Sequence, residues 1–151
     1  MFHLILWTEG YFLKRLKEEL LRAKRYHRIV SILLIEIDKF SQIMELFGAE
    51  EENIIKILAK NISRNLRRVD ILAKLPKPEQ FAIILPETPL SGAMVVARKL
   101  LRAIEKTFYE KYNTVFSPYI VVISYDPLKI DPKTDPKVES ILNILNKGLI
   151  F

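Results

Sequence analysis

Apolar residues in the first part of the chain recur at spacings of three and four. Four residues carry this spacing, which one face of a helix would bury: Phe12, Leu16, Leu20 and Ala23. Thr8 precedes them and is a residue type that favours the N-cap, so we predict a helix from Thr8 to about Tyr26. The segment 29–37 is almost continuously apolar and rich in β-branched residues. This pattern predicts a central strand that is buried on both faces.

The rest of the chain predicts further helices and strands. The expected elements are a short helix over 39–47 that Asp38 caps and Gly48 ends, a helix over 50–68, strands over 71–75 and 80–85, a helix over 88–107, a strand over 119–125 and a helix over 136–147. If the two adjacent helices count as one, the order after the first helix is βαββαβ plus a terminal helix. This is the ferredoxin-like plan, an α+β fold in which helices flank an antiparallel sheet.

Capping and charged residues indicate where two of these helices begin and end. Thr88-Pro89 is typical of a helix start, with a capping side chain followed by proline at the first helical position. The last turn of the helix over 50–68 would contain three basic residues, Arg64, Arg67 and Arg68. Basic side chains there suit the helix dipole.

Composition excludes several kinds of site. The chain has 151 residues, 4 Gly, no Cys and 2 His. So few glycines exclude a glycine-rich phosphate loop, and the absence of cysteine excludes disulfides and zinc–thiolate sites. The length and a hydrophobic content of 50% predict one domain over residues 1–151. No apolar run reaches the ~18 residues of a membrane span, so we expect a cytoplasmic protein, and many Ile and charged residues favour a thermophilic source.

The net charge of +6 is concentrated in the first predicted helix. From Lys14 to Arg28 there are seven Lys or Arg and two Glu, a net charge of +5, so the remainder carries only +1. Such a helix can meet nucleic acid, acidic lipid or a phosphorylated ligand. Its basic residues are not regularly interleaved with aromatic side chains for base stacking, which favours a solvated face. Nucleic-acid binding by this helix stays an alternative.

Several segments carry a more specific pattern. The first strand ends in Glu36-Ile-Asp-Lys-Phe40, the run from Phe81 to Ala93 reads FAIILPETPLSGA, and residues 145–149 read LNKGL. In this order they resemble the GGDEF domains, the diguanylate cyclases of bacterial signalling. The resemblance implies the nucleotidyl cyclase palm, with an extra N-terminal helix, over nearly the whole chain up to the last family helix. In that family two GTP-bearing domains meet, and divalent metals assist phosphoryl transfer to give cyclic di-GMP.

The resemblance also assigns catalytic positions, and most of them differ in this chain. The metal-binding Asp corresponds to Glu36, and the G-G-D/E-E-F signature corresponds to residues 77–81, Lys-Pro-Glu-Gln-Phe. Glu79 keeps the first acidic position, but Gln80 replaces the second and is a poor ligand for a hard cation. The positions that would read guanine or phosphate hold Met44, Asn53 and Ser41. We expect no catalytic residue and no cofactor; Glu36 and Glu79 are the candidate ligands for Mg²⁺ if residual nucleotide binding persists.

A product-binding motif of the family is retained. Arg67 and Asp70 have the R-x-x-D spacing shortly before the signature, and Lys99 occupies the position of a helper Arg on the following helix. Arg can grip phosphate or guanine bidentately, while Lys keeps only the charge. Two roles are open: binding of cyclic di-GMP, or a role in the fold in which Asp70 caps the turn into the next strand.

These observations predict a catalytically inactive GGDEF-like signalling domain that serves as a receiver or protein-interaction module. The alternatives are a cyclic di-GMP receptor, a residual diguanylate cyclase or GTP-binding domain, and the nucleic-acid-binding protein described above. Expected partners are cyclic di-GMP or GTP, a second copy of the chain, or a partner signalling protein.

Overall fold

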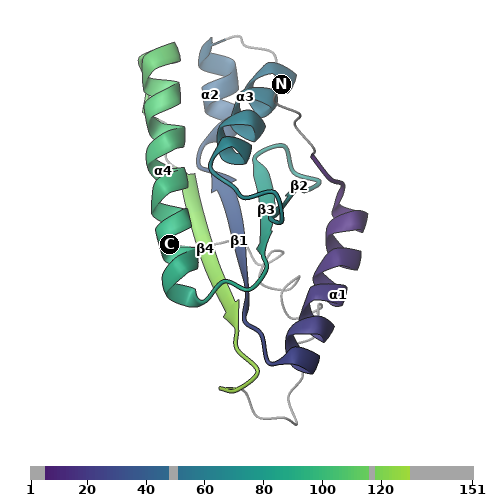
Figure 1. Ribbon diagram of the computed structural model, residues 1–151. Coiled ribbons are helices and arrows are strands. Elements are labelled where there is room, and N and C mark those ends of the chain that lie inside the picture. The colour runs from purple at the N-terminus through teal and green to yellow at the C-terminus, as the bar shows by residue number, and fades with distance from the viewer. Residues whose placement is uncertain (1–5, 48–50, 116–117, 130–151) are drawn as a thin grey trace.

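The computed structural model describes residues 6–47, 51–115 and 118–129. Its elements follow one another in the order α1 (Glu9–Tyr26), β1 (Val30–Ile37), α2 (Phe40–Phe47), α3 (Glu51–Arg64), β2 (Ile71–Lys74), β3 (Gln80–Leu85), α4 (Leu90–Tyr112) and β4 (Pro118–Tyr125) (Figure 1). Three predictions lie outside the described residues: the helix over 136–147, the end of the short helix at Gly48, and the motif at 145–149.

The four strands form one antiparallel sheet in the order β2-β3-β1-β4. β1 lies between β3 and β4, as its continuous apolar sequence predicts, and Glu36 is its only residue that is not fully buried. After α1 the described elements follow the βαββαβ order, with α2 and α3 together in the place of one helix. The predicted ferredoxin-like arrangement is therefore confirmed for the described residues.

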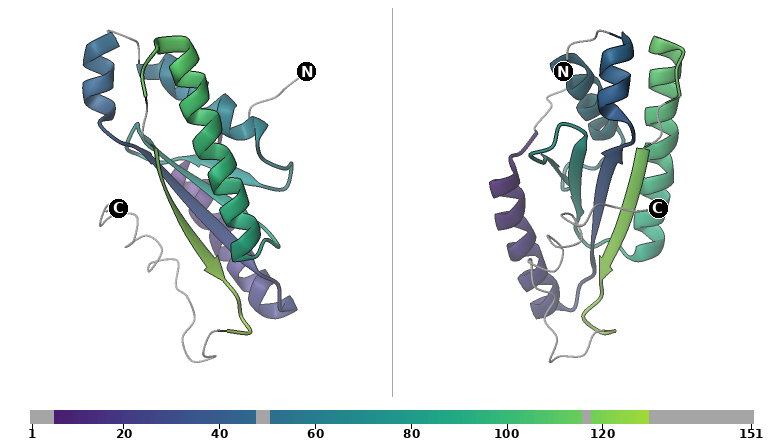
Figure 2. Two further views of the ribbon diagram at one scale, coloured as in Figure 1. Left: turned by 90° about the vertical axis from the view of Figure 1, so that its left-hand side faces the viewer. Right: turned by 180° about the vertical axis from the view of Figure 1, so that it is seen from behind.

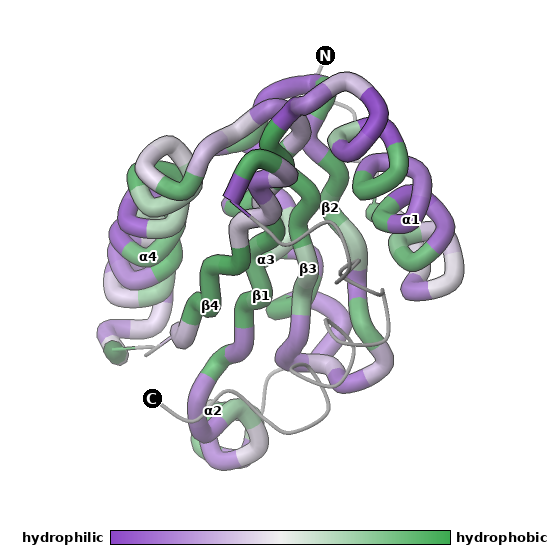
Figure 3. Tube along the Cα trace, turned by 90° about the horizontal axis from the view of Figure 1, so that it is seen from below, coloured by the Kyte–Doolittle hydropathy of each residue, from purple (hydrophilic) through white to green (hydrophobic). Residues whose placement is uncertain are grey.

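Side chains that alternate along the strands build a core on each face of the sheet. Leu33, Ile35 and Ile37 of β1 pack with α2, α3 and α4, whereas Ile32 and Leu34 pack with α1. Figure 2 shows the helices on the two sides of the sheet, and Figure 3 shows that the middle strands are mostly hydrophobic. The four α1 positions predicted to be buried are all in the second core. Because both faces of the sheet are covered, β1 is apolar at successive positions.

The segment before α1 covers the outer edge of β2. Trp7 donates its backbone N–H to the carbonyl of Leu72 at 3.0 Å, and Lys74 donates to the carbonyl of Trp7 at 2.9 Å. Thr8 then caps α1, because its hydroxyl oxygen accepts a hydrogen bond from the backbone N–H of Tyr11 at 3.3 Å. The predicted cap is confirmed, and the edge of β2 is protected from pairing with other chains.

The end of α3 differs from the prediction. The helix ends at Arg64, and the next two amides bond to carbonyls three residues earlier, Asn65 to Ile62 and Leu66 to Ser63. Such bonds tighten the last turn and satisfy carbonyls that have no partner inside the helix. Arg67 and Arg68 therefore lie after α3 rather than in its last turn.

Two predicted helix starts are also wrong in detail. Pro89, not Thr88, is the N-cap of α4, and no side chain caps this helix. The hydroxyl of Thr88 instead donates to the carbonyl of Pro86 at 2.9 Å. At α2 the residue that directly precedes the helix is Lys39, not the predicted Asp38. Lys39 has a left-handed φ of 55°, and its backbone carbonyl accepts a hydrogen bond from the N–H of Ile43. α4 extends to Tyr112, beyond the predicted end at 107.

In the described part of the chain, no helix is both long and apolar enough to cross a membrane.

Candidate functional site

The signature segment lies at the end of the sheet where β1 stops and β3 begins. Glu36 is paired in register with Gln80, and the backbone N–H of Ile37 donates to the carbonyl of Glu79 at 3.1 Å. The sheet therefore brings Glu36 and Glu79, the two predicted metal candidates, to neighbouring positions. Gln80 itself, which is paired with Glu36 and follows Glu79 in the sequence, is buried and carries a neutral amide. Among residues 6–47, 51–115 and 118–129, no group of three or more acidic or His side chains could hold a metal ion.

Lys74, the last residue of β2, occupies the inside of this turn. Its ammonium group donates hydrogen bonds to three backbone carbonyls, those of Leu75 at 2.7 Å, Gln80 at 3.2 Å and Lys77. The turn is closed further by the N–H of Gln80, which donates to the carbonyl of Lys77 at 3.1 Å. A lysine has three donors, so these contacts use its full hydrogen-bonding capacity. The signature turn is thus built around a cation that belongs to the chain.

Burial at this turn affects the titration of Lys74. Removal from water lowers the pKa of its ammonium group to about 8, although the carboxylates of Glu79 and Glu51 act in the opposite direction. The sequence interpretation missed this residue. The available signal was a single lysine at the end of a predicted strand, next to a proline-rich turn. Its importance depends on carbonyls whose positions only the folded turn defines.

Other positions of the expected nucleotide site serve the fold or lie on the surface. The side chain of Met44 packs against the core between the sheet and α2, α3 and α4. Ser41 and Asn53 are exposed. The hydroxyl of Tyr119 donates to the carboxylate of Asp38 at 3.2 Å, and that carboxylate raises the pKa of the tyrosine.

A shallow depression of about 260 Å³ adjoins Asp38. It is lined by Asp38, Lys39, Gln42, Ile43, Leu46 and Val115. One carboxylate and one ammonium group in this lining do not form a phosphate cradle or a metal site. The depression therefore adds no catalytic group to Glu36 and Glu79.

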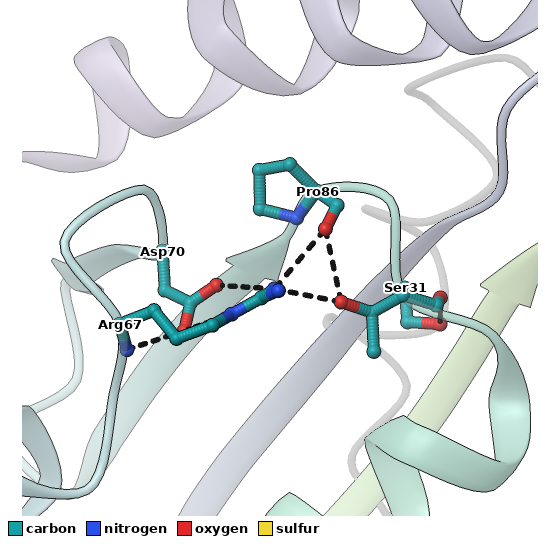
Figure 4. A network of polar contacts seen from close by, with 5 residues as sticks. Ser31, Arg67, Asp70 and Pro86 are labelled. Carbon is teal, nitrogen blue, oxygen red and sulfur yellow. Dashed lines mark hydrogen bonds and ion pairs between the residues drawn. The ribbon is translucent and has the colours of Figure 1, made fainter.

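The R-x-x-D motif forms a compact network next to the start of α4 (Figure 4). The guanidinium group of Arg67 donates to the carboxylate of Asp70 at 2.9 and 3.3 Å, and the backbone N–H of Arg67 donates to it at 2.7 Å. The same guanidinium reaches the carbonyl of Pro86 at 3.1 Å and the hydroxyl of Thr88 at 2.7 Å. Asp70 has a side-chain exposure of only 2%, against 56% for Arg67. The motif therefore ties the turn after α3 to the segment before α4.

Ser31 extends this network to the middle of the sheet. Its hydroxyl donates to the carbonyl of Thr88 at 2.6 Å and lies 3.0 Å from the hydroxyl of Ser124 on β4. The sequence interpretation missed Ser31 because one polar residue in a long apolar strand has no pattern of its own.

Lys99 lies apart from the other two residues of the predicted ligand site. It borders a surface depression of about 390 Å³ on α4, with Val95, Arg98 and Arg102. Within the described residues, no hydrogen bond or ion pair joins Lys99 to Arg67 or Asp70. The structure thus brings Arg67 and Asp70 together but leaves Lys99 among other basic side chains.

Comparison with known proteins places this geometry in context. Residues 6–140 match the family described as "Diguanylate cyclase, GGDEF domain". The diguanylate cyclase DgcP of Pseudomonas aeruginosa is 29% identical over 92 residues, which are 60% of this chain and 14% of that protein. The response regulator PleD of Caulobacter vibrioides is 32% identical over 72 residues, 47% of this chain and 16% of that protein. The matches thus cover a small part of these curated relatives.

Solved structures share the fold. The GGDEF domain of TpbB (YfiN) from Pseudomonas aeruginosa matches with a TM-score of 0.77 at 20% identity, over 93% of this chain and 80% of that one. The diguanylate cyclase SiaD from the same organism, solved with its activator SiaC, matches with a TM-score of 0.70 at 20% identity, over 95% of this chain and 56% of that one. The GGDEF domain of DgcB from Caulobacter crescentus, solved with cyclic di-GMP, matches with a TM-score of 0.71 at 18% identity, over 94% of this chain and 82% of that one.

These likenesses confirm the predicted palm fold of nucleotidyl cyclases. Because the family match over residues 6–140 spans all of the described residues, the chain belongs to the GGDEF domain family.

Proposed function

We propose that this chain is a GGDEF domain that does not make cyclic di-GMP and serves in signalling as a receiver or interaction module. The observation that carries the proposal is the ammonium group of Lys74 inside the signature turn, bonded to three carbonyls. Catalysis in the family needs divalent cations beside the phosphates of GTP. A resident positive charge repels such cations, and the nearby Gln80 offers only a neutral oxygen.

The chemistry of the turn supports the same conclusion. Pro78 has no backbone N–H to offer a phosphate group, and Lys77 fills a position where the family has glycine. The side chain of Met44 is committed to the core and has no amide that could read guanine. If any residual nucleotide binding brought Mg²⁺ to this end of the sheet, Glu36 and Glu79 would be the residues to hold it.

The direct test is incubation of the chain with GTP and either Mg²⁺ or Mn²⁺, followed by chromatography of the nucleotides. The diguanylate cyclase DgcP serves as the active control. We expect no cyclic di-GMP from this chain, and none from the Gln80→Glu variant, because Lys74 and Pro78 remain. Product that forms with the unmodified chain and disappears in Glu36→Gln or Glu79→Gln would overturn the proposal and support a residual cyclase.

A second candidate is a receptor for cyclic di-GMP, and the exposure of Arg67 is the observation that favours it. More than half of this side chain is open to solvent, at 56%, and Lys99 is also exposed. Asp70 is less suited to a ligand, because both of its carboxylate oxygens already accept bonds from Arg67.

Titration calorimetry with cyclic di-GMP tests this candidate. Binding that is lost in Arg67→Ala and weakened in Lys99→Ala, but unchanged in Arg68→Ala, would support it. The absence of heat at high micromolar ligand would remove it and leave the motif with its role in the fold.

A further inference from the structure

The outer side of α4 carries a row of exposed side chains that the linear charge pattern did not reveal. We call this row the α4 stripe, and it consists of Val95, Arg98, Lys99, Arg102, Lys106 and Tyr109. Residues three and four apart lie next to one another on a helix surface, so the six side chains form a continuous band. The residues of α4 that face the core lie at other positions of the helix, Ala93, Ala97, Leu100, Ile104 and Phe108.

The basic side chains of the α4 stripe are available for a partner. Among the described residues, no ion pair or hydrogen bond engages Arg98, Lys99, Arg102 or Lys106, and Glu105 is the only acidic residue between 95 and 109. The basic helix α1 differs, because Glu19 pairs there with Arg15 at 3.1 Å. Ion pairs within α1 offset part of its positive charge, whereas Glu105 and Glu110 of α4 form no ion pair with the basic side chains of the α4 stripe among the described residues.

A second basic segment adjoins the α4 stripe. Between Lys60 and Arg68 the chain has four basic residues and no acidic one. The amide of Asn61 on α3 donates to the carbonyl of Ala103 on α4 at 2.9 Å, which fixes the end of α3 against the middle of α4. The two segments are about thirty residues apart in sequence, so a count along the chain does not join them. The fold therefore places the basic end of α3 next to the middle of α4, where the basic residues of the α4 stripe lie.

The apolar members of the α4 stripe indicate what kind of partner this surface fits. Val95 is 60% exposed and Tyr109 is 57% exposed, and they stand at the two ends of the basic row. At a rise of about 1.5 Å per residue they are roughly 21 Å apart along α4, a length that a partner helix of similar size could follow. Protein interfaces are enriched in Arg and Tyr and bury apolar side chains, whereas a phosphate backbone offers Val95 no apolar contact.

We propose that the α4 stripe is a docking surface for an acidic segment of a partner protein, with carboxylates opposite Arg98 and Arg102 and apolar residues opposite Val95 and Tyr109. This inference rests on the proposed function, because it names the partner of the interaction module. Arg binds carboxylates bidentately, and opposite charges speed association and select against basic partners.

The test is fluorescence anisotropy with two labelled probes at low and physiological salt. One probe is a helical 18-residue peptide with Glu at every third or fourth position and a Leu near each end. The other is a single-stranded oligouridylate of 20 nucleotides. The variant Arg98→Glu/Arg102→Glu changes the α4 stripe, and Lys14→Glu/Lys17→Glu on the exposed side of α1 is its control with the same change in net charge.

We expect the peptide to bind and the α4 variant to weaken it at least about tenfold, while the α1 control changes it less than about twofold. Val95→Ser is expected to weaken the peptide about fivefold, because its apolar contact is lost. Equal losses in both double variants, no peptide binding, or tighter binding of the RNA with no effect of Val95→Ser would each overturn the proposal.

The same protein samples are assayed for turnover of GTP. Formation of cyclic di-GMP would contradict the proposed function, whether or not the peptide binds. Absence of peptide binding without turnover would remove only the docking surface.

Discussion

Arg67 and Lys74 are exposed or half-exposed basic residues whose side chains the fold uses in full. Arg67 satisfies a carboxylate that has almost no access to water, and Lys74 satisfies three carbonyls of a tight turn. A buried acceptor that loses its partner costs more than an exposed ion pair gains. These two residues therefore lead to predictions about stability that do not depend on any ligand.

The first prediction concerns Arg67→Ala. The substitution leaves the buried carboxylate of Asp70 with the backbone N–H of residue 67 as its remaining partner in the network, and it leaves the carbonyl of Pro86 with only its bond from the hydroxyl of Thr88. We expect the free energy of unfolding to fall by about 1–3 kcal/mol, measured by urea denaturation at neutral pH. Arg68→Ala, at the exposed neighbouring position, should change it by less than about 0.5 kcal/mol. Equal effects of the two substitutions would contradict a role for Arg67 in the fold.

The second prediction concerns pH and Lys74. Its pKa is about 8 in the folded chain and 10.5 as an ordinary lysine, so between these values the unfolded chain binds more protons. The free energy of unfolding must then rise with pH across this window, as the cost of burying the charge disappears. We expect wild type to gain stability relative to Lys74→Met from pH 8 to pH 9.5, measured by urea denaturation. A constant difference between the two proteins would show that the pKa of Lys74 is not lowered.

Sequence interpretation at the scale of single residues succeeded where a pattern fixed the environment. The buried positions of α1 follow from spacing alone, and all four lie in the core. Arg67 and Asp70 were identified by their spacing, but two roles stayed open because contacts with Pro86 and Thr88 bring together segments about twenty residues apart. Lys74 was missed for a different reason. Its three carbonyl partners belong to the same turn, but only the folded backbone directs them at the ammonium group.

At the scale of elements, the order and type of the described helices and strands were predictable, but their ends were less so. β1 is apolar at nearly every position and could be assigned from composition, whereas the helix predicted over 50–68 ends at Arg64. The run of basic residues continues past Arg64, so the sequence does not show where α3 ends. Only the tightened backbone hydrogen bonds mark the end of the helix. Thr88 has the sequence of a cap, but its hydroxyl makes a tertiary contact with Arg67 instead.

The cap of α1 gives a prediction at this scale. The hydroxyl of Thr8 satisfies the N–H of Tyr11, one of the amides that lack a partner inside the helix. We expect Thr8→Ala to reduce the free energy of unfolding by about 1 kcal/mol, measured by thermal or urea denaturation. Thr8→Ser retains the hydroxyl and is the control, with a much smaller effect. If Thr8→Ser were as unstable as Thr8→Ala, the loss would come from packing of the methyl group and not from the cap.

For the molecule as a whole, one sheet joins two separate cores. α1 covers one face, and α2, α3 and α4 cover the other, so each strand contributes side chains to both sides. The arrangement of charged residues on the surface also depends on which segments the fold brings together. In the sequence nearly all of the net positive charge falls on α1, whereas the fold brings the basic end of α3 next to the basic residues of α4. Both features follow from contacts between distant segments, which explains why composition and periodicity did not reveal them.

The shared sheet predicts cooperative unfolding of the two cores. Leu16 lies in the α1 core and Leu100 in the core of α4, and both are fully buried. Replacing either by Ala should lower the free energy of unfolding by about 2–5 kcal/mol. Trp7 is the only tryptophan of the chain and sits beside β2 and α1, so its fluorescence reports on that side, while far-ultraviolet circular dichroism includes the long helix α4. Because losing one core exposes the sheet that the other needs, we expect the two signals to coincide in urea for both variants. A fluorescence transition that precedes the dichroism change in Leu16→Ala would show instead that α1 detaches from a sheet that α4 alone can hold.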